Sequence, residues 1–170
     1  MERDYDIGLR EYQERIQNER ELPKYASKII DRLIEQGVIP SEAEVLAHFS
    51  VLVEVELDRA ESYEKIPDDP DDMGRMCHFK VNNDGHMSEL YLHYAEQYHL
   101  TLLPRMLCKL EHLEVICFPN NIIKPIPEWI INLKSLRVLD VSNDHRPNPE
   151  VLDSIKSFIE SLESFNEFYR

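Results

Sequence analysis

The sequence predicts an α/β repeat fold: a short stack of strand-containing units with a parallel sheet, capped by an N-terminal helical region and a C-terminal helix. The first observation is a period of 23 residues, because Leu103-Pro104 and Ile126-Pro127 share one phase. The apolar residues after each pair recur at the same spacing, as Leu107, Leu110 and Leu113 and then as Ile130, Leu133 and Leu136. The second observation is a set of apolar stripes with helical spacing towards both ends of the chain. A fixed period indicates stacked copies of one unit, each burying its face against the next.

The most regular unit has the frame Leu113-x-x-Ile116-x-Phe118-x-x-Asn121-x-Ile123-x-x-Ile126-Pro127. This frame resembles the leucine-rich repeat, in the 23-residue form that is common in intracellular proteins. The resemblance implies that the first three apolar residues belong to a short strand. It also implies that Asn121 turns the chain by hydrogen bonding to neighbouring backbone groups, and that Pro127 opens an irregular or helical return.

The resemblance covers residues 87–144, with one complete repeat in the middle. The preceding copy begins at Met87, is three residues longer, and has Ala95 at the asparagine position. The following copy begins at Leu136 and decays, because Arg146 occupies a position that should be apolar. Residues 77–147 are therefore expected to hold an entry hairpin and the repeats.

Residues 1–66 are predicted to form helices that close one end of the stack. A first apolar stripe is followed by a second helix that stops at Gly37. Ser41 and Glu44 have the spacing of a capping box, which would start a third helix running to about Tyr63. The residues from Val51 to Leu57 also alternate like a strand, but the capping box and the length favour a helix. The residues of the first stripe are Tyr5, Leu9, Tyr12 and Ile16.

Three further segments complete the expected organisation. Residues 67–76 form an acidic linker, without the ligand spacing of a calcium loop. Alternation on both sides of the turn at residues 82–85 predicts a hairpin that leads into the first repeat. Residues 148–170 are predicted to be a capping helix that begins at Asn148-Pro149-Glu150. Its apolar face would cover the other end of the stack: Leu152, Ile155, Ile159, Leu162 and Phe165.

The formal net charge of −14 disfavours nucleic acid as a partner, because affinity for phosphate backbones rests on basic residues. An anionic membrane surface is disfavoured for the same reason, and no apolar run reaches the roughly 20 residues that span a bilayer. Long-range attraction favours a basic partner, although excess charge also serves solubility. The start of the chain lacks the apolar core of a secretory signal, and three cysteines do not make a disulfide framework. We therefore expect a cytoplasmic protein, monomeric or weakly dimeric.

Strand geometry predicts where a protein or peptide would bind. Successive side chains of a strand alternate, so Leu90, Ile116 and Leu139 should point into the core while their neighbours face out. The resemblance implies that this outward, concave face binds other proteins; the alternative is an idle solvated sheet, with binding through helices or loops. Tyr91 would be the anchor for a basic or amphipathic segment. The outward grid has three rows of residues: Glu89, Tyr91 and His93; Val115, Cys117 and Pro119; Val138, Asp140 and Ser142.

The residues do not predict an enzyme. Cys117 would lie beside Asp140 and diagonal to His93, but diagonal neighbours on a sheet are roughly 7 Å apart or more. That distance is too long for the imidazole to activate the thiol, so we interpret Cys117 as an ordinary exposed thiol. The histidine spacing does not fit zinc, and neither a metal nor a cofactor is expected.

The leading hypothesis is a non-catalytic protein–protein interaction module that acts as an adaptor or regulator. One alternative is a targeting or regulatory component of a larger enzyme system, such as an effector or ligase. A third hypothesis is a structural unit that assembles with copies of itself edge to edge.

Overall fold

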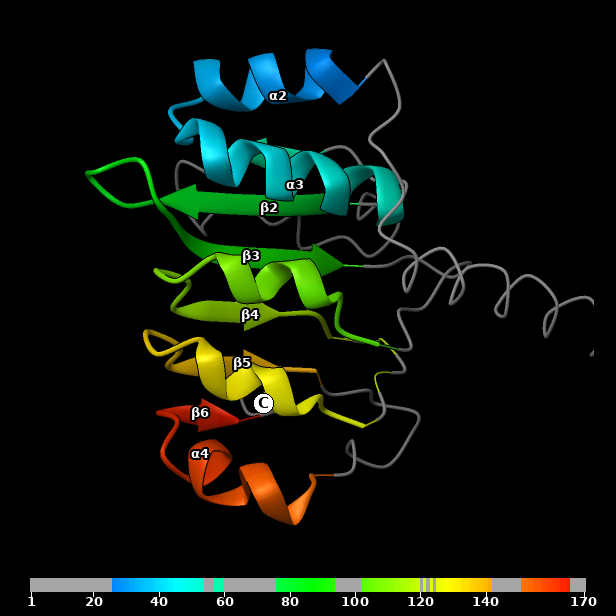
Figure 1. Ribbon diagram of the computed structural model, residues 1–170, viewed down its shortest axis with the longest axis vertical. Coiled ribbons are helices and arrows are strands. Elements are labelled where there is room, and N and C mark those ends of the chain that lie inside the picture. Colours follow the sequence, from blue (N-terminus) through cyan, green and yellow to red (C-terminus); the bar gives the residue numbers. More distant parts are fainter. Residues whose placement is uncertain are drawn as a thin grey trace, which may run out of the picture.

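The computed structural model describes residues 26–53, 57–59, 76–93, 102–119, 121, 123, 125–141 and 151–165. These residues form a mixed α/β fold around a six-stranded, mostly parallel sheet in the order β1-β2-β3-β4-β5-β6 (Figure 1). The strands are β1 (Leu57–Arg59), β2 (Met76–Val81), β3 (Met87–His93), β4 (Val115–Cys117), β5 (Val138–Asp140) and β6 (Ser164–Phe165). The helices are α2 (Ala26–Glu35), α3 (Pro40–Val53), η2 (Arg105–Lys109), η3 (Glu128–Asn132), η4 (Asp153–Ile155) and α4 (Lys156–Glu160). The helices α3, η2 and η3 lie along one face of the sheet (Figure 1).

Strands β3 to β6 are parallel and follow one another both in the chain and in the sheet. Leu90 pairs with Ile116, 26 positions further on, and Ile116 pairs with Leu139, 23 positions further on. Leu139 in turn pairs with Phe165, again at a distance of 26 positions. The register between strands is therefore constant, while the length of the connection varies by three residues.

The two helical returns η2 and η3 also lie 23 positions apart and begin in the same way. Pro104 and Pro127 are extended, with φ of −62° and −75°, and each carbonyl accepts a hydrogen bond from the residue three positions later. A proline suits this place because its fixed φ matches the turn and its missing N–H is not needed there. These short 3₁₀ helices of five residues each carry the chain back towards the start of the next strand.

Helix α2 ends where the sequence predicts. Gly37 has a φ of +89°, which only glycine adopts without strain. Its N–H donates to the carbonyl of Ile34, and the N–H of Val38 donates to that of Leu33, at 2.9 Å and 3.0 Å. These two bonds are the Schellman arrangement, so the prediction that Gly37 stops the helix is confirmed.

Helix α3 differs from the prediction at both ends. It begins at Pro40, and the carbonyl of Ile39 accepts hydrogen bonds from Glu42 and Ala43, so Ser41 lies inside the first turn and does not cap it. The predicted capping box is wrong because proline at the first helical position already provides a favourable start. The helix stops at Val53 instead of about Tyr63, and the chain forms β1 from Leu57.

Strand β1 is held by pairing with β2 and by hydrogen bonds to the end of α2 and the residue that follows it. Asp58 pairs in parallel with His78 of β2. The guanidinium of Arg32 donates to the carbonyl of Leu57 at 3.1 Å, and Arg59 donates to the carbonyl of Gln36. The alternation from Val51 to Leu57 therefore predicted the conformation of Leu57 correctly, whereas Val51 to Val53 are helical. The contacts of β1 to α2 and β2 outweigh the helix propensity of this segment.

The predicted hairpin is confirmed. Strands β2 and β3 pair antiparallel, and Gly85 takes a φ of +83° in the turn between them. The side-chain oxygen of Asn82 accepts hydrogen bonds from the N–H groups of Asp84 and His86, both at 3.0 Å. An asparagine that satisfies backbone donors in this way stabilises a tight turn.

The C-terminal capping helix is much shorter than predicted. Residues 153–160 form η4 and α4, and the chain then adds β6 to the sheet, so Phe165 belongs to a strand. The hydroxyl of Ser161 donates to the carbonyl of Phe158 at 2.7 Å, and such a local side-chain bond competes with helix continuation. The proposed cap at Asn148 lies outside the described residues.

One hydrophobic core joins the helices to the sheet. It extends from Leu33 of α2 through Phe79 and Ile116 of the strands to Ile159 of α4. The predicted inward side chains are confirmed as buried: Leu90, Leu92, Ile116, Phe118, Leu139 and Val141. Asn121, which is 1% exposed, donates from its side chain to the carbonyls of Phe118 and Pro119 at 2.9 Å and 3.2 Å. The buried turn after β4 is therefore satisfied internally.

Candidate functional site

The sheet face opposite the inward residues carries two rows of side chains, whose alignment follows from the strand register. The first row crosses five strands as Lys80, Glu89, Val115, Val138 and Ser164. The second row crosses four strands as His78, Tyr91, Cys117 and Asp140. The predicted neighbours Glu89–Val115–Val138 and Tyr91–Cys117–Asp140 are thus confirmed as neighbours in the sheet.

Burial of these rows differs from the prediction. Tyr91 is 3% exposed, Cys117 0%, Val138 8% and Asp140 1%, so the expectation that they face solvent is wrong. Pro119 is buried as well. The strands have near-continuous apolar runs, from Val115 to Phe118 and from Val138 to Val141, which are typical of parallel strands buried on both faces. Alternation identifies the face of a strand on which a side chain lies, but it does not tell whether that face is covered.

Glu89 is already engaged by its neighbours. Its carboxylate lies 2.8 Å from the ammonium of Lys80 and accepts a hydrogen bond from the hydroxyl of Tyr91. Lys80 also lies 6.0 Å from the centre of the Tyr91 ring. Lys80 and Glu89 keep 27% and 26% of their side chains exposed, so solvent weakens the ion pair without removing it. This corner of the sheet face is therefore polar, accessible and locally neutral.

The remaining residues of the predicted grid add little to an exposed binding surface. His93 ends β3, where its backbone pairs with Met76, and Ser142 lies outside the described residues. Cys117 and Asp140 are direct neighbours in the register, but the thiol is fully buried, so the interpretation of Cys117 as an exposed thiol is wrong. Neither Cys108 nor Cys117 forms a disulfide.

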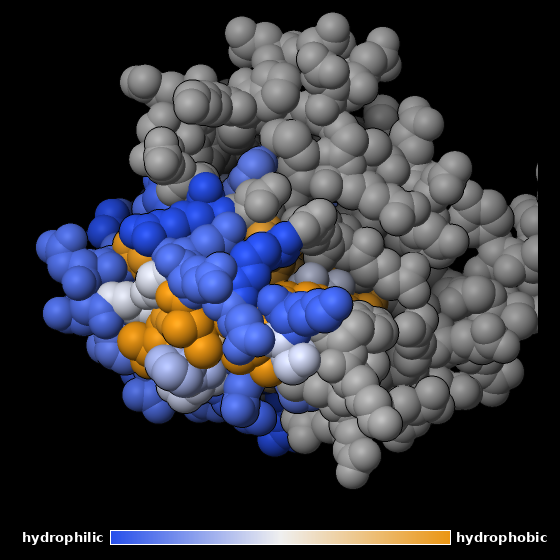
Figure 2. Space-filling view, turned by 90° about the horizontal axis from the view of Figure 1, so that it is seen from above, coloured by the Kyte–Doolittle hydropathy of each residue, from blue (hydrophilic) through white to orange (hydrophobic). Residues whose placement is uncertain are grey.

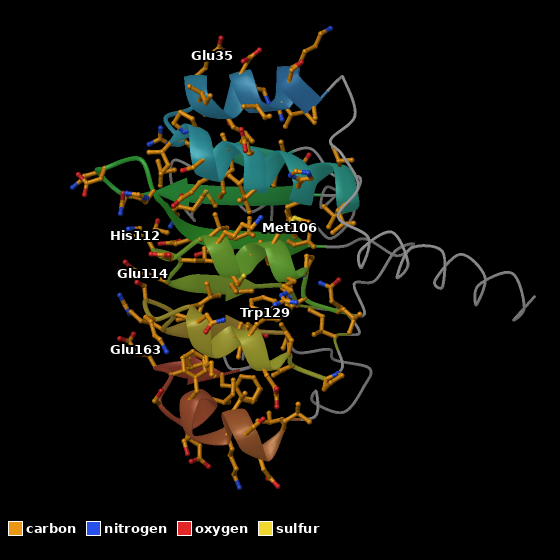
Figure 3. All side chains as sticks on the ribbon, in the orientation of Figure 1. Glu35, Met106, His112, Glu114, Trp129 and Glu163 are labelled. Carbon is orange, nitrogen blue, oxygen red and sulfur yellow. The ribbon has the colours of Figure 1, made fainter. Side chains whose placement is uncertain are left out.

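A ladder of charges lies beside the sheet, at the residues that precede three strands. Arg137 contacts Glu114 at 3.0 Å and Glu163 at 2.9 Å. The hydrogen bond to Glu163, its charge and then the charge of Glu114 raise the pKa of Arg137 above its ordinary value. Figure 3 places Glu114 and Glu163 on the same side of the sheet as His112. All three charged side chains are exposed by 43% or more, so solvent weakens both ion pairs.

A second polar cluster joins three separate segments on that side. Glu42 of α3 has one carboxylate oxygen 2.9 Å from Nδ1 of His86 in the hairpin, and the other accepts the N–H of Met87 at 2.6 Å. The ring of His86 lies against the ring of His112, with centroids 4.0 Å apart and planes tilted by 35°. Sequence reasoning missed this cluster because its members are 26 to 70 positions apart and form no local motif.

Apolar exposure is limited. Among the described residues, the exposed large apolar side chains are Ile34 on α2, at 40%, and Ile131 on η3, at 37%. Figure 2 views the molecule from the α2 end, where an apolar patch lies among hydrophilic side chains. Trp129 and Met106, labelled in Figure 3, hold corresponding positions in η3 and η2 and pack partly on the core.

Within the described ranges, no three His, Cys, Asp or Glu side chains are grouped so that they could together hold a metal ion. The described helices include none that is long and apolar enough to cross a bilayer. Comparison with known proteins gives no match to a family model, to a curated protein or to a solved structure.

Proposed function

We propose that this chain is a non-catalytic interaction module of the leucine-rich-repeat kind, acting as an adaptor or regulator in a reducing, cytoplasmic setting. The observation that carries the proposal is the register of β3, β4 and β5, in which residues 26 and 23 positions apart lie side by side. Sequential units of this kind present a continuous row of side chains to a partner. The buried side chain of Asn121, bonded to two carbonyls, further supports the resemblance to the repeat.

The proposed contact surface is the first row of the sheet face and not the whole predicted grid. Four of its members, Lys80, Glu89, Val115 and Ser164, are only partly buried. Val138 in the same row, and Tyr91 and Asp140 in the second row, are shielded. A partner segment would cross the strands, place an apolar side chain on Val115 and pair polar groups with the two ends of the row. Because Lys80 neutralises Glu89, a basic partner gains less from this surface than the net charge alone suggests.

The test places a photo-crosslinking amino acid at Val115 in one variant and at Ser157, exposed on α4, in another. A partner captured through position 115 and not through position 157 is then purified, and its affinity is measured for Val115→Lys and Ser157→Lys. We expect at least a tenfold loss of affinity for Val115→Lys only, because a charge at the centre of an interface must be desolvated. Equal affinities for both variants and wild type would contradict binding at the first row.

A further inference from the structure

We propose that His86 and His112 bind one divalent transition-metal ion, of which Zn²⁺ is the probe, with Glu42 as the positioning residue. The site lies where the start of α3, the hairpin turn and the turn before β4 meet. It goes beyond the proposed partner-binding row, because none of its three residues belongs to that row.

The geometry prepares His86 as a ligand. An ionised carboxylate only accepts hydrogen bonds, so Glu42 takes the proton-bearing Nδ1 of His86 as donor at 2.9 Å. In the neutral imidazole the other ring nitrogen, Nε2, then carries a lone pair. Metal-binding histidines commonly have their second ring nitrogen held by a carboxylate, which fixes the ring orientation and strengthens the ligand.

Glu42 is itself held firmly in place. Its side chain is 8% exposed, and its second oxygen accepts the backbone N–H of Met87 at 2.6 Å. A buried carboxylate with two fixed donors does not move easily, so its role is to orient His86 and not to bind the ion directly.

His112 supplies the second ligand. Its ring lies 4.0 Å from that of His86, and the side chain is exposed, so it can turn to bring a nitrogen towards a shared ion. Zinc takes imidazole nitrogens at about 2.0–2.1 Å, and with two histidines as ligands the rest of its shell would be filled by water. Imidazole ligands select Zn²⁺, Cu²⁺ or Ni²⁺ over Mg²⁺, which prefers oxygen ligands.

A bound ion would connect the hairpin to the turn before β4 and, through Glu42, to α3. Because the two ligands are brought together only in the folded chain, binding would stabilise the folded state and raise the melting temperature.

The experiment titrates Zn²⁺ into the full chain by calorimetry and follows thermal melting with and without the ion. We expect His112→Ala, at an exposed turn position, to lose one Zn²⁺ per chain and the increase in melting temperature. His48→Ala is the matched control, because His48 lies on α3 and bonds the carbonyl of Glu44 instead. It should bind Zn²⁺ like wild type, and Mg²⁺ should have no effect on any variant.

A second pair of variants keeps the test decisive if a substitution disturbs folding. Glu42→Gln retains a polar side chain of similar size, and it should weaken Zn²⁺ binding about 10- to 100-fold while the ion count stays at one. His86→Gln should abolish the site. Equal Zn²⁺ stoichiometry and affinity in wild type and His112→Ala would overturn the proposal, as would a melting temperature that Zn²⁺ leaves unchanged.

Discussion

Phe118 and Phe49 link the end of β4 to the helix that covers it. Both side chains are fully buried, and their rings stack with centroids 5.8 Å apart and an angle of 22° between the planes. An aromatic pair of this geometry adds about 0.5–1.5 kcal/mol beyond the area it buries. The pair is one of the contacts through which α3 and the sheet share a core.

We expect Phe118→Ala to lower the free energy of unfolding by about 3–5 kcal/mol, because it leaves a large cavity in a closed core. Val115→Thr, at a half-buried position on the other face of β4, should lower the free energy of unfolding much less. Urea denaturation of both variants measures the difference. Similar losses would mean that Phe118 does not occupy the core position that the register gives it.

At the scale of elements, the turn between α2 and α3 rests on the hairpin turn. The N–H of Ile39 donates to the carbonyl of Gly85 at 3.0 Å, so two turns 46 positions apart hold one another. A Cβ atom at Gly85 would lie 2.8 Å from the carbonyl oxygen of Gly37 and 3.2 Å from the side chain of Ile39. Gly85 is therefore required for two reasons, the close approach of the other turn and its positive φ.

Gly85→Ala should therefore destabilise the protein more than Gly37→Ala. Both positions have positive φ, which costs an alanine about 1–2 kcal/mol. At Gly37 the new methyl group meets the end of the Arg59 side chain, at 2.9 Å, which can shift if its hydrogen bond to Gln36 loosens. At Gly85 the methyl group meets backbone, which cannot shift as easily. Melting temperatures of the two variants test this order, and the reverse order would show that the two turns are not in contact.

The charge ladder between β4, β5 and β6 is a weaker connection. We expect Arg137→Gln to change the melting temperature little, because exposed ion pairs are hydrated and contribute little to stability. Any difference from wild type should shrink as salt is raised, since the screening length falls to about 3 Å at 1 M. A large loss that persists in high salt would contradict this assignment.

How far the elements could be predicted depended on how local their signals are. The Schellman turn at Gly37 and the hairpin at Gly85 were predictable, because each is encoded within a few residues. Strand β6 was missed because its apolar residues also fit a helix stripe. The neighbouring strand β5 has the same spacing of apolar residues, because Leu136 and Leu139 correspond to Leu162 and Phe165. This match was the signal in the sequence that could have predicted β6.

At the scale of the whole molecule, the described helices and strands form one structural body. A continuous core runs from Leu33 to Ile159, and α3 contacts both α2 and η2. The sequence could predict the grid of the sheet face because the same apolar pattern recurs in β3, β4 and β5 and aligns these strands. It could not predict burial of that face or the Glu42–His86 contact, since both depend on segments distant in the chain.

A single cooperative unfolding transition follows from the shared core. Trp129, the one tryptophan in the sequence, packs partly on the core from η3. Among the described elements, α2 and α3 are the longest helices and contribute to the far-ultraviolet circular dichroism. Tryptophan fluorescence and circular dichroism should therefore give coincident urea transitions. An earlier loss of the dichroism signal would mean that the helices unfold independently of the sheet.

Paired residues of neighbouring parallel strands are 26, 23 and 26 positions apart. These unequal spacings indicate where insertions and deletions can be accommodated. Three residues can be inserted into a connection while the pairing of the strands on either side stays in register. Loop closure also becomes only slowly less favourable with length, by about 0.6 kcal/mol for a doubling. Insertions and deletions between strands are thus the changes that this architecture can absorb most easily, whereas a one-residue shift within a strand would turn every core side chain to the opposite face.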